Sequence, residues 1–245
     1  MVRRHRRVEV YEQGEAPSYT RGFRMEMQVS EAGRQLLMKT YMWMFAALSV
    51  TGVVAMYVLS SRDILMYLRM NPGVLIGMLI GELILVGIIA GMVHRMSVPV
   101  AAGTFFFYAA LNGITLAPLF LMYTSTSIAN TFFITAGMFA VTTVYGYTTK
   151  RDLTGIGHFA MMGLIGIIIA SIVNIFTGSS MLHWLISVIG VVVFTLLTAY
   201  DTQMIVQMGE EGDNSSQTAI YGALELYLDF INLFILLLRL FGSRE

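Results

Sequence analysis

Four carboxylic acids lie inside long apolar runs of this 245-residue sequence: Glu82, Asp201, Glu225 and Asp229. An ionised carboxylate in the middle of a bilayer costs at least ~2.5–3.5 kcal/mol on insertion scales, so such a residue faces a protein interior or a watery cavity. Residues of this kind in membrane proteins commonly relay protons or line ion paths. We therefore take these four as the candidate functional residues.

Their spacing predicts how they are arranged. Glu225, Asp229 and Asn232 are spaced i, i+4, i+7, which makes one polar stripe on a helix. At ~1.5 Å per residue, Asp201 lies roughly 10 Å and Asp229 roughly 13 Å from the same membrane face, and Glu82 roughly 16 Å. The last two apolar runs form an antiparallel hairpin, so the two aspartates can face each other. We expect Glu82 to converge on the same layer.

Two carboxyl groups in contact at low dielectric cannot both ionise cheaply, so Asp201 and Asp229 are expected to share a proton. The protonated pair would hold the last two helices together. The doubly ionised pair would repel itself or take up a cation such as Ca²⁺, which prefers carboxylate oxygen. The pair is thus predicted to be a proton-sensitive ion gate and a transient Ca²⁺ ligand. Asn112 and Thr115 could extend its polar lining, although such side chains also simply tie helices together.

Composition determines the class of protein. Hydrophobic residues make up 56% of the chain and charged residues 12%, with a mean hydropathy of +0.71, whereas soluble domains are ~25% charged. The apolar runs are long enough for helices that cross ~30 Å of hydrocarbon and lack the alternation of barrel strands. We predict an all-α integral membrane protein with seven transmembrane helices. These spans are placed near 38–59, 74–93, 100–123, 128–148, 156–176, 182–208 and 219–241.

Small residues in the second span suggest how it packs. Gly73, Gly77 and Gly81 are spaced i, i+4, i+8. Glycines at this spacing allow helix backbones to approach closely. We expect the second span to pack tightly against its neighbours through them.

Charge predicts domains and orientation. Residues 1–35 read as a flexible basic cytoplasmic tail and residues 36–242 as the transmembrane domain, because the tail has no apolar stretch that could form a core. With the N-terminus inside, the inner side holds eleven Lys and Arg and the outer side four; this excess predicts a cytoplasmic N-terminus. The net charge is zero, and no basic stripe indicates nucleic-acid binding.

Four segments carry a family resemblance. The sequence resembles the Bax inhibitor-1 family, also called the transmembrane Bax inhibitor motif family, and the general layout covers nearly all of residues 30–242. The matching segments are AYDTQMI at 199–205, ALELYLDFINLFILLLRLFG at 223–242, GELILVGIIAGMVHRMSVP at 81–99 and FAALSVTG at 45–52.

The resemblance implies a central last helix wrapped by the other six. It also implies a pH-sensitive Ca²⁺-leak channel whose two sensor aspartates match Asp201 and Asp229, with Glu82 matching the family's acidic residue on the second helix. Some members use an arginine at the inner end of that helix as a latch to the sensor. Here the register puts Val93 or His94 at that place, and Arg95 is the possible substitute.

Other classes of function fit less well. An intramembrane aspartyl protease needs a Gly-x-Gly-Asp motif, but Asp229 follows Leu-Tyr-Leu. A zinc hydrolase needs clustered histidines, and the four here are scattered without an HExxH motif. We therefore expect no enzyme and no cofactor. A proton-coupled transporter or antiporter remains the alternative, as does a non-conducting regulator of other membrane proteins such as a membrane protease.

The expected partners are the lipid bilayer, Ca²⁺ and H⁺, and possible further partners are other membrane proteins. Short loops and the arginine-rich N-terminal segment indicate a bacterial inner (plasma) membrane, with the chain crossing it several times.

Overall fold

Every regular element in the described part of the chain is helical. The computed structural model describes residues 30–243, so residues 1–29 of the predicted tail lie outside it. The elements are α2 (Glu31–Ser60), α3 (Arg62–Met70), α4 (Pro72–Met92), the 3₁₀ turn η1 (Val93–Arg95), α5 (Val98–Phe120), α6 (Ser125–Thr148), α7 (Thr154–Thr177), α8 (Ser180–Glu210) and α9 (Ser216–Phe241).

The helices confirm an all-α integral membrane protein that crosses the bilayer several times. Six are long and apolar enough to span a membrane: α2, α4 with η1, α5, α6, α7 and α8. The count of seven stays a prediction, with α9 as the remaining candidate. The short helix α3 was not expected, because its nine residues fall between two predicted spans.

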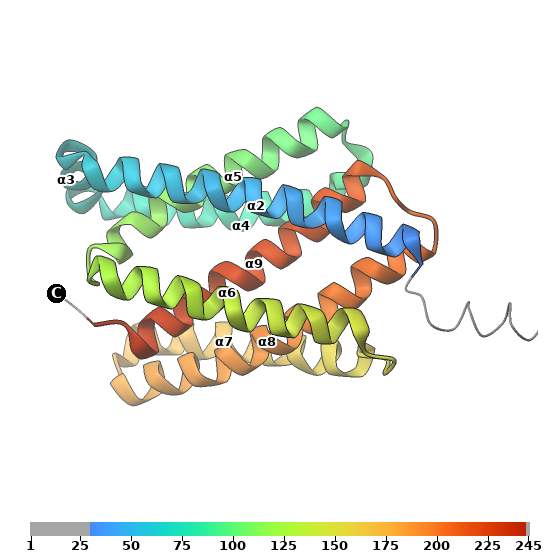
Figure 1. Cartoon of the computed structure of the whole chain (residues 1–245). Helices are drawn as coiled ribbons and strands as arrows, with labels where there is room; N and C mark the ends of the chain where they lie inside the picture. Colours follow the sequence, from blue (N-terminus) through green and yellow to red (C-terminus); the bar gives the residue numbers. More distant parts are fainter. Residues whose placement is uncertain (1–29, 244–245) are drawn as a thin grey trace, which may run out of the picture.

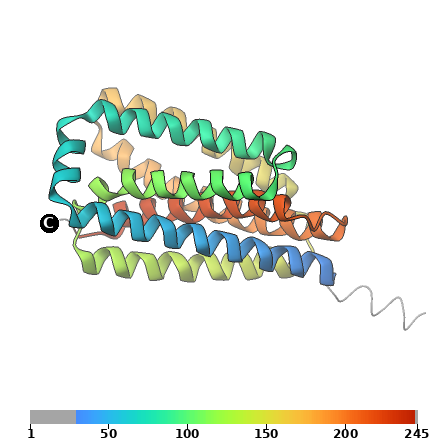
Figure 2. The same cartoon turned by 90° about the horizontal axis from the view of Figure 1, so that it is seen from above.

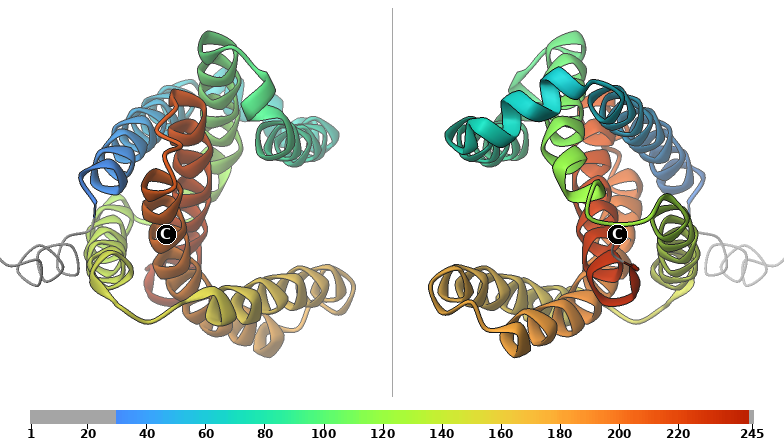
Figure 3. Two further views of the ribbon diagram at one scale, coloured as in Figure 1. Left: turned by 90° about the vertical axis from the view of Figure 1, so that its right-hand side faces the viewer. Right: turned by 90° about the vertical axis from the view of Figure 1, so that its left-hand side faces the viewer.

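The last helix is the centre of the bundle. α9 contacts α2, α4, α5, α6 and α8. It runs obliquely in the view of Figure 1 and lies among the other helices in Figure 2. End-on, α4 and α7 occupy the periphery (Figure 3). The partners of α7 differ from the expected wrapping, because it packs mainly against α8. Most of the apolar surface of α4 and α7 is exposed, which suits a helix that faces lipid.

The bundle has two ends that differ in their polar contacts. At one end, here called the N-terminal end, the backbone N–H of Ser30 donates to Glu210 Oε1 at 3.1 Å, and Lys39 Nζ donates to the carbonyl of Asn214 at 3.2 Å. At the other end, here called the α3 end, the Thr124 N–H donates to the carbonyl of Ser243 at 3.1 Å. Each contact joins segments that are far apart in the sequence.

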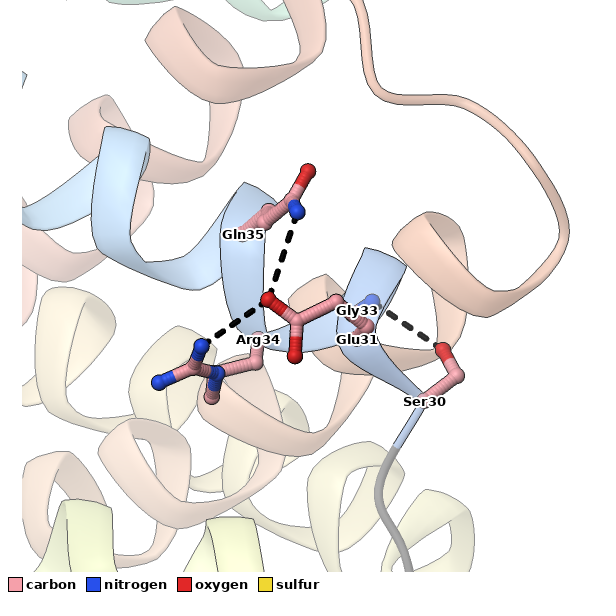
Figure 4. A network of polar contacts seen from close by, with 5 residues as sticks. All are labelled: Ser30, Glu31, Gly33, Arg34 and Gln35. Carbon is pink, nitrogen blue, oxygen red and sulfur yellow. Dashed lines mark hydrogen bonds and ion pairs between the residues drawn. The ribbon is translucent and has the colours of Figure 1, made fainter. Parts of the chain in front are cut away.

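Helix α2 begins before the predicted boundary at residue 36. Ser30 is its N-cap and accepts a hydrogen bond from the N–H of Gly33, while Glu31 accepts from Arg34 at 2.9 Å and Gln35 at 3.3 Å (Figure 4). Such a cap satisfies a backbone donor that the first turn leaves unpaired. Residues 31–35 are therefore helical rather than part of a tail.

The expectation for the glycines of α4 is wrong. Cβ atoms at Gly73 and Gly77 would meet nothing within 4 Å, and one at Gly81 would make only an ordinary contact. The close approach occurs elsewhere: a Cβ at Gly146 on α6 would overlap the carbonyl oxygen of Ala199 on α8. Glycine spacing did not distinguish a packed face from one left open.

Candidate functional site

The structure brings Asp201 and Asp229 together. They lie on the antiparallel neighbours α8 and α9, and both side chains are buried, at 7% and 3% exposed. Their carboxyl groups lie within hydrogen-bonding reach of each other. The matched depth predicted for these residues therefore corresponds to a contact between them.

One carboxylate oxygen of this pair lacks a hydrogen-bond donor. Asp229 Oδ2 is buried and has no hydrogen-bond partner among residues 30–243. The hydroxyls of Thr198 and Thr202 on α8 donate to backbone carbonyls of their own helix. A buried carboxylate oxygen without a donor is costly.

A third carboxyl group stands beside the pair. Glu225 lies one turn from Asp229 on α9, is half-buried, and contacts the hydroxyl of Tyr221. Its charge is close enough to interact with that of Asp201. A hydrogen bond from Tyr41 on α2 to Thr143 on α6, at 2.7 Å, lies near the same site.

Glu82 binds side chains other than the two aspartates, and its place in the same layer stays a prediction. Its carboxylate accepts hydrogen bonds from two α5 side chains, Thr115 at 2.6 Å and Asn112 at 3.3 Å. Helix α4 packs against α5 and α9. The depth count predicted a level for Glu82 along the membrane normal and carried no information on its position around the bundle.

Residues that the sequence did not single out extend the Glu82 network across the core. The Tyr227 hydroxyl donates to Asn112 Oδ1 at 3.2 Å and lies 2.7 Å from Thr51 Oγ1 on α2. Tyr227 is fully buried, so its polar tip needs these partners. Its place two residues before Asp229 was the only available signal.

Two other predicted residues make no hydrogen bond or ion pair with the two aspartates. Asn232 donates to the carbonyl of Leu228 in its own helix at 2.8 Å. Arg95 is exposed at the N-terminal end and forms no ion pair with the described residues. The latch role of Arg95 stays a prediction.

The acid groups are too few for a resident metal site. Residues 30–243 contain no group of three or more His, Asp or Glu side chains that could hold a metal ion. Ca²⁺ usually takes six to eight oxygen ligands.

A polar cavity lies at the N-terminal end of the bundle, beside the last turns of α8. It has a volume of about 260 Å³ and is lined by Gln203, Lys150, Arg151 and Glu210 among others. Gln203 fixes the loop between α6 and α7, because its Oε1 accepts from the Leu153 N–H at 2.8 Å and its Nε2 donates to the Arg151 carbonyl at 2.9 Å.

The acidic loop between α8 and α9 caps a helix. Asp213 accepts hydrogen bonds from the Thr218 hydroxyl at 2.7 Å and the Ser215 N–H at 3.3 Å. These bonds favour the ionised form, and the one from Thr218 has the largest effect in lowering the pKa of Asp213 below its ordinary value. The carboxylate thus has a structural task at the start of α9.

Fold and site define a class: a helical membrane protein that crosses the bilayer several times and holds a buried aspartate pair between its last two helices. The sequence profile of the family described as Inhibitor of apoptosis-promoting Bax1 matches residues 33–245. The chain therefore belongs to the Bax inhibitor-1 family, as the four sequence segments predicted.

Several bacterial proteins are similar over most of their length. The inner membrane protein YbhL of Escherichia coli K12 is 48% identical over 220 residues, which cover 87% of this chain and 94% of YbhL. A protein of Borreliella burgdorferi is 42% identical over 86% of this chain and 93% of its own length. Protein RP147 of Rickettsia prowazekii is 42% identical over 88% of this chain and 92% of its own length.

Proposed function

We propose that the protein is a pH-sensitive leak channel for Ca²⁺ in the bacterial inner membrane, gated by a proton shared between Asp201 and Asp229. The inner-membrane location rests on the similarity to YbhL and on the multi-pass fold. The observation that carries the gate is the burial of Asp229 Oδ2 beside the Asp201 carboxyl, without a hydrogen bond from the residues between 30 and 243.

The gating step follows from charge. With one proton between them, the two carboxyls hydrogen-bond and hold α8 against α9. Loss of that proton leaves two buried negative charges in contact, which repel strongly at low dielectric. Separation of the two helices, or neutralisation by a passing cation, relieves this repulsion.

Neighbouring groups complete the proposed path. Glu225 adds a third carboxyl on the N-terminal side of the pair, and the polar cavity beside Gln203 opens the same end of α8 to solvent. Glu82 acts separately, as a second acidic group held by Asn112 and Thr115. In this proposal the protein has no catalytic residue and no cofactor.

Ca²⁺ flux into proteoliposomes at pH 6–8 tests the proposal. Asp201→Asn and Asp229→Asn each replace an ionisable member of the pair with an amide of nearly equal size, so the pH dependence of flux should flatten in both. Glu211→Gln, in the exposed loop between α8 and α9, is the matched control and should behave like the wild type. Identical pH profiles in all four proteins would contradict the gate.

The same liposomes discriminate the alternatives. A buried carboxyl pair can also relay protons, so a proton-coupled transporter or antiporter would exchange protons for a solute without leaking Ca²⁺. A non-conducting regulator of other membrane proteins, such as a membrane protease, would show neither activity.

A further inference from the structure

A large cavity at the α3 end is not used by the proposed gate. It has a volume of about 890 Å³ and lies between α3, the start of α4 and the end of α5. Ligand sites commonly fall between about 300 and 1,000 Å³. Its walls are largely apolar, with Leu65, Leu68, Leu75, Pro118 and Met122 among the lining residues.

Two arginines supply the charge of this cavity. Arg62 and Arg69 both line it and are seven residues apart, so they lie on the same side of α3. Neither side chain forms an ion pair or a hydrogen bond with any residue between 30 and 243. They also lie at the bundle end opposite the predicted positive excess, so orientation by basic loops does not explain them.

Helix α3 has the character of an interfacial helix. It joins α2 to α4 across the end of the bundle (Figures 1 and 2). It buries Leu68 at 3% exposed, whereas Met66, Tyr67 and Met70 are more than half exposed. Because α2 and α4 span the membrane, α3 lies where lipid headgroups meet acyl chains, the depth that such helices and tyrosine rings favour.

We propose that this cavity binds one anionic phospholipid. Arg62 and Arg69 hold the phosphate, since a guanidinium offers a planar fork of donors that matches phosphate oxygens. One acyl chain lies along the apolar wall formed by Leu65, Leu75 and Pro118. The two arginines match the anionic headgroup of such a lipid, and the apolar wall of the same cavity matches its acyl chains. A free phosphate would use only the arginines.

Native mass spectrometry of the full chain in detergent tests this site. Wild type is titrated with dioleoyl phosphatidylglycerol and with dioleoyl phosphatidylcholine, which has the same acyl chains and no net charge. We expect the first equivalent of phosphatidylglycerol to bind about tenfold more tightly. Both lipids carry the phosphate, but the quaternary ammonium of phosphatidylcholine is repelled by the two arginines, at a cost of about that factor. Equal binding of the two lipids by wild type would overturn the proposal.

Variants test whether Arg62 and Arg69 cause the preference for phosphatidylglycerol. Arg62→Gln with Arg69→Gln should abolish it, whereas Arg62→Lys with Arg69→Lys should retain part of it, because lysine keeps the charge but loses the fork. Arg239→Gln is the matched control: Arg239 is exposed near the same end of the bundle and does not line the cavity. A double glutamine variant that still prefers phosphatidylglycerol, or a control that loses the preference equally, would contradict this assignment.

A second measurement reports on the apolar wall. Leu121 lines the cavity and is 52% exposed, so tryptophan in Leu121→Trp should be quenched by phosphatidylglycerol with brominated chains. Quenching should fall at least severalfold when both arginines are glutamine. Quenching unchanged by the arginines, or a second copy of the chain bound here instead of lipid, would overturn the proposal.

Discussion

The hydroxyl of Tyr227 on α9 lies 2.7 Å from Oγ1 of Thr51 on α2, inside the core. Because the same hydroxyl also donates to Asn112 on α5, one phenol joins the central helix to two of its neighbours. The network ends at Glu82 on α4. A polar chain across four helices is expensive to leave incomplete, since each buried group without a partner carries its full desolvation cost.

Removal of this hydroxyl should therefore loosen the bundle. Tyr227→Phe is expected to lower the free energy of unfolding by about 1–3 kcal/mol, because Asn112 and Thr51 each lose a partner. Unfolding in a denaturing detergent measures the change. The control is Tyr108→Phe, since Tyr108 is equally buried and packs edge-on against the Tyr227 ring, but its hydroxyl has no hydrogen bond with the described residues. Equal losses in the two variants would contradict the role of the network.

Close packing between α6 and α8 should depend on Gly146. Gly146→Ala is expected to destabilise the protein by about 1–3 kcal/mol, because the new methyl group overlaps the Ala199 carbonyl and the two backbones must move apart. Gly137→Ala, on the same helix with nothing within 4 Å, should be neutral or stabilising by about 0.5–1 kcal/mol. Thermal unfolding of both variants tests the difference, and similar melting temperatures would contradict it.

The sequence predicts the positions of the spanning helices well and the rotation of each helix poorly. Apolar runs of ~20 residues identify spanning helices, since every backbone group in lipid must pair within its own helix, and the predicted spans match the long helices closely. The rotation of each helix about its own axis is not predictable in this way. Long apolar helices are hydrophobic all round, so no periodicity distinguishes the face toward lipid from the face toward protein. Hence the glycines of α4 were assigned to packing, and the hydrogen bonds of Glu82 to α5 were not predicted.

The aspartate pair was predictable for a physical reason. A hairpin of two long helices fixes the relative depth of Asp201 and Asp229, so counting residues was enough. The network of Tyr227 was not, because Thr, Tyr and Asn are common in helices and find partners only once rotation is known. The N-cap at Ser30 explains the early start of α2, but nothing in the apolar pattern marks that residue.

The loop between α6 and α7 should become mobile without the side chain of Gln203. Gln203→Leu removes the acceptor of the Leu153 N–H and the donor to the Arg151 carbonyl. Amide exchange at Leu153 should then be at least tenfold faster, since a bond worth about 1.4 kcal/mol protects it. Gln207→Leu is the control, because Gln207 lines the same cavity without bonding the loop. Unchanged exchange in Gln203→Leu would show that other contacts hold the loop.

The hydrogen bonds that Asp213 accepts at the start of α9 should make part of the stability depend on pH. Its pKa is lowered in the folded protein, chiefly by the Thr218 hydroxyl, so its contribution is fully present above the unfolded pKa of about 3.9. That contribution is lost as the pH falls through the folded pKa. Asp213 is exposed, so solvent keeps the effect small.

The difference between wild type and Asp213→Asn isolates this contribution from other acids. We expect the wild type to melt at a higher temperature at pH 6, and the two melting curves to converge as the pH falls below 4, because a protonated aspartate resembles asparagine in charge. Glu211→Gln, two residues away in the same loop, should follow the wild type throughout. A difference between wild type and Asp213→Asn that stays constant from pH 6 to pH 3 would show that the charge of Asp213 does not contribute to stability.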